Sequence, residues 1–364
     1  MLNKEVVSDR QGIFLVILFV IGSGSVTVPG LEAKQDVWLA SILGIVLSLP
    51  MVFIYARLQY IFPDKDLYDI IQICFGRFLG NLVIIFFVLH LIAIQGTIIR
   101  HHGEFITVVG LIDTPIIIII FLFSGVVAYA SKKGIEVLGR WGELFIKVVI
   151  PLTVIMLILF IPDMNINNIK PMLAKGIKPL ALGSFKILVF PFSQIVVFSA
   201  VFSSFRKRKS PYNIYLKGFL ISALIMFATS LSVILVLGVN QAGSKYFSTH
   251  AAVTRINIMS MQRVEVLSSI LFLLGGFVKM GIHLIAICIG ISKIFRLRDY
   301  RILVIPVAAQ LVNLTYLTWY GTMDFFEFDR DAMPYISFLN RVIIPIVVLI
   351  FAEIKKKKLT DIST

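Results

Sequence analysis

Ten apolar runs of about 20 residues follow one another along the chain, and the segments between them contain most of the charged residues. A helix needs about 20 apolar residues to cross a bilayer, so each run predicts one membrane-spanning helix. The predicted spans are Gly12–Leu31, Trp38–Ile61, Asn81–Thr107, Pro115–Ala130, Leu138–Ile161, Leu182–Phe205, Ile214–Val239, Val264–Phe295, Ile302–Trp319 and Tyr335–Ile354. The pattern predicts an all-α integral membrane protein with a single transmembrane domain.

The first span contains an interruption near its middle. The four residues at this point, followed closely by Pro29 and Gly30, are Gly22, Ser23, Gly24 and Ser25. Glycines and serines there favour unwinding, which lipid tolerates only where the backbone is buried in protein or lines a polar cavity. We therefore expect a ligand site at this break. A signal peptide and a seam of small residues for close helix packing are the alternatives.

The sixth span contains a second predicted break. Its residues are Phe190, Pro191, Phe192 and Ser193, and the proline removes one helical hydrogen bond. Each break lies in the first span of a five-helix half, and an odd number of helices gives the halves opposite orientations. This arrangement predicts an inverted-repeat transporter fold, with repeats of approximately 8–161 and 182–354 and a ligand site between the breaks. A simple proline kink is the alternative for Pro191 alone.

Composition and charge support this interpretation. Of the 364 residues 58% are hydrophobic and 15% are charged, where soluble domains average about 25% charged residues. The net charge of +14 comes from short basic clusters between spans, which is typical of membrane orientation and not of nucleic-acid binding. Most of these clusters share one side if both termini are cytoplasmic. Arg341 is then counted among the fewer basic residues of the outer side.

Three connections are more than tight turns. The segment Pro63–Gly80 has apolar residues at helical spacing and is expected to lie along the inner membrane surface. Asp163–Gly183 is expected to form a long outer loop. Thr249–Met261 is expected to include a short helix that covers the mouth of the ligand site.

Several segments resemble those of one known family. They are Ile21-Gly22-Ser23-Gly24-Ser25 with Val28-Pro29, Asn167-Asn168-Ile169-Lys170-Pro171, Arg206–Lys209 and Gly276-Phe277-Val278-Lys279. In their order they resemble the B subunits of spore germinant receptors, the endospore germination permeases of the amino acid–polyamine–organocation superfamily. The resemblance covers essentially the whole chain. Many transporting members of that superfamily are longer, whereas ten spans are predicted here.

Charged residues inside predicted spans are candidates for ion binding or coupling. Glu143 and Lys147 are four residues apart in the fifth span, where they could also form a structural pair. In proton-coupled members of the superfamily a fifth-helix lysine faces the first and eighth helices, and the resemblance suggests that role for Lys147. Lys279 and His283 share one face of the eighth span, and Lys279 is too deep to reach the membrane surface easily.

The remaining polar residues indicate no enzymatic chemistry. His90 is expected to be a packing residue, and the Arg100–Glu104 cluster is expected to form a gate or a salt-bridged rim. Lys186 is a further charge at the outer rim. No phosphate loop, nucleophile elbow, metal-ligand pattern or cofactor motif is present, and Cys74 and Cys288 are far apart.

The resemblance implies a nutrient receptor subunit in the inner membrane of a spore, acting with receptor A and C subunits. The small-molecule germinant is expected to be an amino acid whose carboxylate meets amides of residues 22–25, although a sugar or nucleoside remains possible. The alternative function is an amino acid or polyamine permease coupled to protons or sodium ions.

Overall fold

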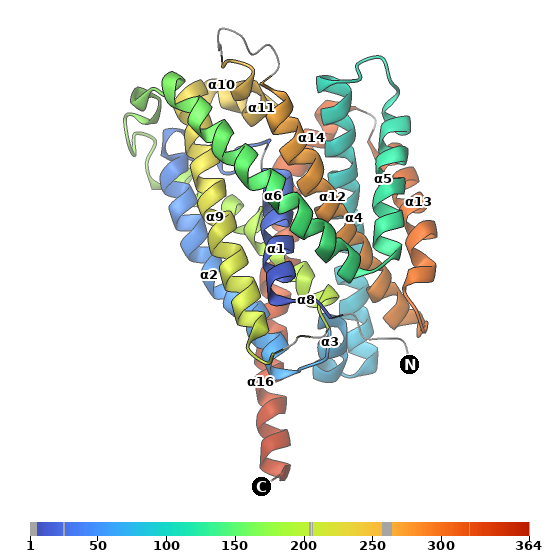
Figure 1. Ribbon diagram of the computed structural model, residues 1–364. Coiled ribbons are helices and arrows are strands. Elements are labelled where there is room, and N and C mark those ends of the chain that lie inside the picture. The colour runs from blue at the N-terminus through green and yellow to red at the C-terminus, as the bar shows by residue number, and fades with distance from the viewer. Residues whose placement is uncertain are drawn as a thin grey trace.

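The chain forms a bundle of helices in the computed structural model, which describes residues 6–24, 26–203, 205, 207–256, 264–319 and 321–363, without the side chains of residues 23 and 357–363 (Figure 1). The helices of the first half are α1 (Asp9–Gly24), η1 (Leu31–Asp36), α2 (Val37–Ile61), α3 (Leu67–Phe75), α4 (Arg77–Val109), α5 (Ile116–Lys132), α6 (Ile135–Phe160), η2 (Ile161–Asp163) and η3 (Ile166–Ile169). Those of the second half are α7 (Ile177–Val189), η4 (Phe192–Val196), α8 (Val197–Val201), α9 (Ser210–Leu237), α10 (Val239–Gly243), α11 (Ser248–Val253), α12 (Val266–Phe295), α13 (Arg301–Thr318), α14 (Thr322–Asp331), α15 (Met333–Phe338), the π-helical turn η5 (Leu339–Ile343) and α16 (Ile344–Ser363).

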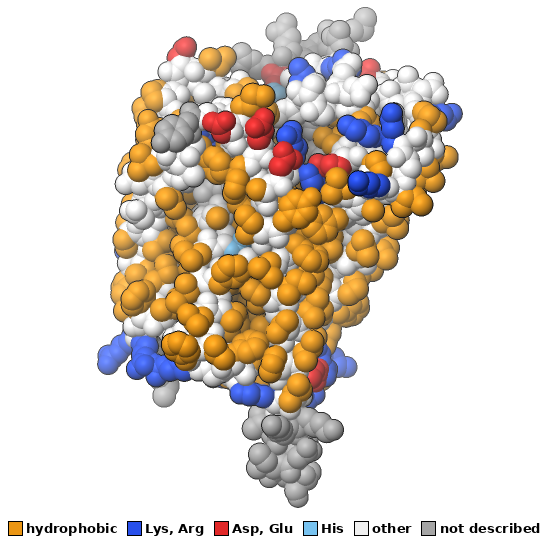
Figure 2. Space-filling view, turned by 180° about the vertical axis from the view of Figure 1, so that it is seen from behind, with side chains coloured by type: hydrophobic (Ala, Val, Ile, Leu, Met, Phe, Trp, Pro, Cys, Tyr) orange, Lys and Arg blue, Asp and Glu red, His pale blue; other side chains and the backbone are white. Residues whose placement is uncertain are grey.

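Eight helical segments within the described residues are long and apolar enough to cross a membrane, and α5 is a further apolar helix of 17 residues. A belt of hydrophobic side chains surrounds the middle of the face shown in Figure 2. Lysine and arginine gather at the end from which α16 projects, and the opposite end carries both acidic and basic groups. Such a belt is the surface expected where lipid replaces water. The expected all-α membrane architecture is confirmed.

The first span is broken, but a few residues later than expected. Helix α1 continues to Gly24, and η1 begins at Leu31 after a connecting segment. Gly30 has φ 79°, a left-handed conformation that glycine adopts without strain. The segment is held by the short α11, because Val26 O accepts a hydrogen bond from Thr249 N at 3.1 Å and Val28 N donates to Ser248 Oγ at 3.1 Å.

The sixth span is broken at the expected place. Helix α7 ends at Val189, Phe190 is extended with φ −136° and ψ 123°, and η4 begins at Phe192 after Pro191. Proline has no amide hydrogen and a fixed φ, which explains why the helix does not run through this point. Both α1 and α7 therefore end inside the bundle, and each presents a C-terminal end with its partial negative charge.

Close packing of α1 against α12 depends on two glycines. A Cβ atom on Gly22 would lie 2.2 Å from the carbonyl carbon of Gly275, and one on Gly275 would lie 2.3 Å from the Cα of Gly22. Only hydrogen at both positions allows the two backbones to approach so closely. The small-residue packing seam that the sequence left open is therefore present at Gly22.

Two of the expected accessory helices are present. Helix α3 lies within the segment 63–80 and packs on α4 and α16. Its N-cap is Asp66, whose side chain accepts a hydrogen bond from Asp69 N at 2.9 Å. Helix α11 forms the first part of the expected mouth helix, whereas residues 257–263 lie outside the described residues.

Candidate functional site

A cavity of about 940 Å³ lies between the two broken helices and opens toward the end of the bundle that carries α10, α11 and α14, here called the mouth end (Figure 1). Residues of the connecting segment after α1, of η1 and of α7 line it together with residues of α4, α12, α14, α15 and η5. Ligand pockets for small molecules usually have volumes of about 300–1,000 Å³, so this cavity is large enough for a nutrient molecule.

Lys279 is one of the residues that line the cavity, and it is fully buried. Its Nζ donates a hydrogen bond to Oε1 of Gln194, which η4 places just beyond the break in the sixth span. The same ammonium group lies 5.0 Å from the ring centre of Phe19 and 5.2 Å from that of Phe190. Cation–π contacts of this kind stabilise a desolvated cation. Lys279 thus connects α12 to both broken helices.

Arg341 is a second buried cation beside the cavity, and it belongs to the π-helical turn η5. Its Nη1 donates to the carbonyl of Val189, the last residue of α7, at 3.0 Å. Its own carbonyl accepts a hydrogen bond of 2.5 Å from the Tyr55 hydroxyl. A cation at a helix C-terminus is electrostatically favourable, so Arg341 stabilises the broken end of α7. Single π-helical turns occur frequently at functional sites.

Ion pairs surround the mouth of the cavity. Lys186 Nζ lies 2.6 Å from Glu32 Oε1 and joins α7 to η1. His101 Nε2 lies 3.1 Å from Asp329 Oδ2, which joins α4 to α14. Because these side chains are partly exposed, each pair contributes modestly to stability, but together they tie the elements around the opening. The rim role expected for Lys186 agrees with this placement.

The cluster at 100–104 also follows the expected salt-bridged arrangement. Arg100 Nη2 lies 2.6 Å from Glu104 Oε1, and both side chains are buried. The Thr322 hydroxyl donates to the same carboxylate oxygen at 3.0 Å and so connects α14 to α4.

His283 lies one helical turn after Lys279 on α12 and does not line the cavity. It is buried, stacks on Phe19 with ring centres 5.1 Å apart, and its Nδ1 lies 3.0 Å from the carbonyl oxygen of Lys279. The structure therefore places Lys279 and His283 on one face of α12, as their spacing predicts, and both side chains contact Phe19 of α1. A coupling role for the two polar residues stays a prediction.

The residues expected to bind the ligand are only partly at the cavity. Phe190 lines it, whereas Pro191, Phe192 and Ser193 are not among its lining residues. Gly22 and Gly24 pack inside the bundle, Ser23 is part of α1, and Ser25 lies outside the described residues. Amides of residues 22–24 belong to the hydrogen-bonded part of α1, so they are not presented to a carboxylate as the sequence analysis expected. The lining residues after this break are instead Thr27 to Glu32.

Glu143 and Lys147 do not belong to the cavity. Lys147 is exposed on the surface of α6, and the face of α6 that packs on α1 is formed by residues such as Gly142, where a Cβ would meet Leu15. The side chains of residues four apart share one face, which here points away from α1. The position expected for Lys147 opposite the first and eighth helices is therefore not the one it occupies.

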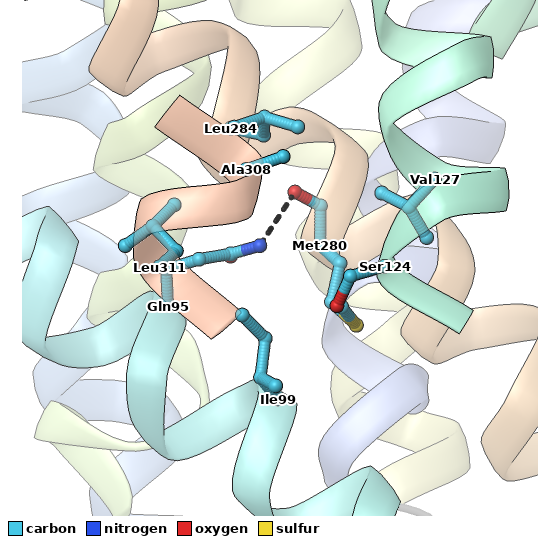
Figure 3. Close-up of a pocket in the computed structure, with 8 residues that line it drawn as sticks. All are labelled: Gln95, Ile99, Ser124, Val127, Met280, Leu284, Ala308 and Leu311. Atoms are coloured by element: carbon cyan, nitrogen blue, oxygen red, sulfur yellow. Dashed lines mark hydrogen bonds between the residues drawn. The ribbon is translucent and has the colours of Figure 1, made fainter. Parts of the chain in front are cut away.

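A second internal space lies between α4, α5, α12 and α13 (Figure 3). It has a volume of about 10 Å³ and is lined mostly by apolar side chains, with Gln95 Nε2 donating to the Met280 carbonyl at 3.2 Å. A space of this size holds at most about one water molecule. It is too small for a nutrient, so the large cavity is the candidate ligand site.

Arg341 and Gln194 are not among the site residues expected from the sequence. Arg341 lies inside the predicted tenth span, and an intramembrane arginine is by itself an indication of function. Gln194 directly follows the Phe190–Ser193 break, but nothing in the sequence pairs it with Lys279.

Solved structures with the same fold are transporters. MHP1, a nucleobase-cation-symport-1 family transporter in a closed conformation with bromovinylhydantoin bound, superposes with a TM-score of 0.65, covering 89% of this chain and 77% of its own at 13% identity. MhsT in complex with L-phenylalanine gives 0.60, covering 95% and 88% at 12% identity. A manganese transporter from Eremococcus coleocola gives 0.58, covering 94% and 78% at 14% identity. Fold and cavity define a membrane protein with the inverted-repeat transporter architecture and broken first and sixth helices.

Sequence comparison then identifies the family. Residues 6–319 match the spore permease family, described as Spore germination protein, and the chain belongs to that family. Spore germination protein KB of Bacillus subtilis (strain 168) is 28% identical over 98% of this chain and 97% of its own. Putative spore germination protein YfkT of the same organism is 23% identical over 97% of each chain. These relatives are germination proteins and transporters, not enzymes.

Proposed function

We propose that the chain is the ligand-binding subunit of a nutrient germinant receptor, and that the germinant binds in the cavity between the two broken helices. The observation that carries the proposal is the position of this cavity, because its walls come from α4 and α12 as well as from both broken spans. A molecule bound there contacts elements that move relative to one another in proteins with this architecture.

Germinant binding changes the helix bundle because the germinant has a higher affinity for one arrangement of the helices than for another. A germinant that contacts η1 and α7 on one side and α4 and α12 on the other favours the arrangement in which these elements are close together. The receptor A and C subunits then respond to this change in the inner membrane of the spore. The family membership and the resemblance support these partners and this location.

Coupled transport is the second candidate function. The observation that favours it is the buried Lys279 with His283 behind it, because an intramembrane lysine at a substrate cavity suits coupling to a proton. Substrate-dependent uptake into vesicles that contain the purified protein distinguishes a permease from a receptor. A receptor binds its germinant in these vesicles without accumulating it.

Germination of spores that lack the gene tests the proposed receptor. The spores are exposed to single amino acids, sugars or nucleosides, and the gene is returned as wild type, Phe190→Ala or Phe185→Ala. Phe190 lines the cavity directly after α7 ends, whereas Phe185 within α7 is not a lining residue and contacts the lining only through its stacking on Tyr335.

We expect loss of the response to one ligand class, restored by wild type and Phe185→Ala. Phe190→Ala should require about 10-fold more germinant or more, since burying an aromatic side chain is worth about 1.5–3 kcal/mol. Equal restoration by all three genes would contradict the location of the site in this cavity.

A further inference from the structure

The hydrogen-bonding capacity of Arg341 is only partly used within the protein. A guanidinium group has five N–H donors, and Nη1 donates to Val189 O. Nη2 is buried and has no hydrogen-bond acceptor among the residues that the structure describes, although the side chain is only 4% exposed. A buried charged donor without an acceptor is strongly unfavourable, so this atom indicates an acceptor from outside the chain.

The carboxylates around the cavity are already paired with other cations. Glu32 pairs with Lys186 at 2.6 Å, Asp329 with His101 at 3.1 Å and Asp331 with Arg330 at 2.9 Å. No described carboxylate oxygen lies within 4 Å of the Arg341 guanidinium. The carboxylates that line the cavity are thus neutralised by their own ion pairs. The positive charge of Arg341 has no such partner among them.

Arg341 is also held in place by hydrogen bonds at both its backbone and its side chain. Its backbone carbonyl accepts from Tyr55, which is itself fully buried, and its Nη1 is fixed on the end of α7. The π-helical turn inserts an extra residue into the helix at this level and so changes the direction of its side chains. This preorganised guanidinium, with Lys279 also lining the cavity, suits recognition of a planar carboxylate.

We propose that Arg341 is the anion-binding residue of the cavity and that the ligand is a small carboxylate, such as a free amino acid. The proposal rests on the proposed function, because it assigns the ligand class of the same cavity. Arg341 Nη2 donates to one carboxylate oxygen, and Lys279 adds a second positive charge from α12. The carboxylate is therefore recognised near the end of α7 and not by amides of α1. Neutral sugars and nucleosides lack the group that this site requires.

Ligand binding to the purified full-length protein in lipid nanodiscs tests the proposal. The probes are the twenty common L-amino acids, glucose and inosine, and each amino acid that binds is compared with its own carboxamide. Replacing the carboxylate by an amide removes the charge with little change in size. We expect the carboxamide to bind about 10- to 100-fold more weakly, which is the range for one hydrogen bond between charged groups.

Variants at Arg341 distinguish a loss of carboxylate recognition from a loss of folded protein. Arg341→Gln should bind the acid about 10- to 100-fold more weakly while its affinity for the carboxamide changes less than about 3-fold, because the lost interaction is with the charge. Arg341→Lys should recover part of the difference. Arg255→Gln, an exposed arginine at the mouth end and outside the cavity lining, is the matched control and should bind both compounds like wild type.

Each outcome decides between the two proposals. Equal binding of acid and carboxamide to wild type would overturn the role of Arg341 and leave the receptor proposal standing, as would binding of glucose or inosine alone. Unchanged affinity of Arg341→Gln for the acid would also overturn it. A wild-type protein that binds none of the probes would contradict the proposed function itself.

Discussion

Replacing Gly22 by alanine tests the crossing of α1 and α12 on which the cavity depends. The added methyl group would lie 2.2 Å from the carbonyl carbon of Gly275, whereas ordinary contacts begin at 3.4 Å. The obstacle is backbone, which cannot rotate away, so α1 and α12 must separate by about 1 Å. Overpacking of this kind costs about 1–3 kcal/mol, and we expect the upper end of that range.

This separation should also affect the cavity. Phe19 precedes Gly22 by about one helical turn, and Lys279 follows Gly275 by about one turn. The distance from Lys279 Nζ to the ring centre of Phe19 is 5.0 Å. Thermal unfolding of the purified variant, measured by differential scanning fluorimetry, should have a midpoint about 5 °C below wild type. Germinant affinity should fall in parallel because the Phe19–Lys279 contact is disturbed.

Gly24→Ala is the matched control for this measurement. Its methyl group would lie 2.3 Å from Met226 Cε, the flexible end of a side chain that can move to another rotamer. We expect this variant to lose less than about 1 kcal/mol. Equal midpoints for wild type and Gly22→Ala, or equal losses for the two variants, would refute the assigned role of the glycine crossing.

Two further predictions concern charged groups. Lys279→Met removes a fully buried cation, so the variant should unfold in the same assay at an unchanged or higher temperature. Its ligand affinity should be lost. Lower stability with full ligand affinity would instead argue for a purely structural lysine. Burial raises the pKa of Asp66 from 3.8 to about 6, with Lys293 opposing this shift. The folded protein therefore holds this proton more tightly than the unfolded chain, so its stability decreases as the pH rises from about 4 to above 6. Asp66→Asn should flatten the pH dependence of the unfolding midpoint between pH 4 and 7, and identical profiles would contradict this assignment.

Much of the fold could be predicted because bilayer crossing imposes a simple rule on sequence length and polarity. The apolar runs gave the long helices, and Pro191 located the second break because proline cannot continue the hydrogen-bond ladder. The first break was placed a few residues too early. A glycine such as Gly22 permits both unwinding and close helix packing. Which of the two occurs depends on Gly275, which contacts Gly22 in space but lies far from it along the chain.

The site was harder to predict because it also depends on contacts between segments that are far apart along the chain. Lys279 and His283 were found because intramembrane charges are rare, and their shared helix face follows from spacing alone. Lys147 has the same sequence properties, yet it lies on the exposed face of α6. Arg341 was counted only among the basic residues of the outer side, since its contact with Val189 depends on tertiary packing between segments far apart in the chain.

A germinant that occupies the cavity between the broken helices shields a cysteine placed in the cavity wall, so a cysteine-protection measurement can locate it. Thr97 lines the cavity, and in a protein whose two native cysteines, Cys74 and Cys288, are replaced by serine, Thr97→Cys offers a single reactive site in the pocket. A second protein with cysteine at the exposed Lys175, outside the lining, reports general effects of the ligand. We expect the nutrient that triggers germination to slow modification at position 97 by a small thiol reagent and to leave modification at position 175 unchanged. Equal modification rates at position 97 with and without a saturating concentration of that nutrient would show that the germinant does not occupy this cavity.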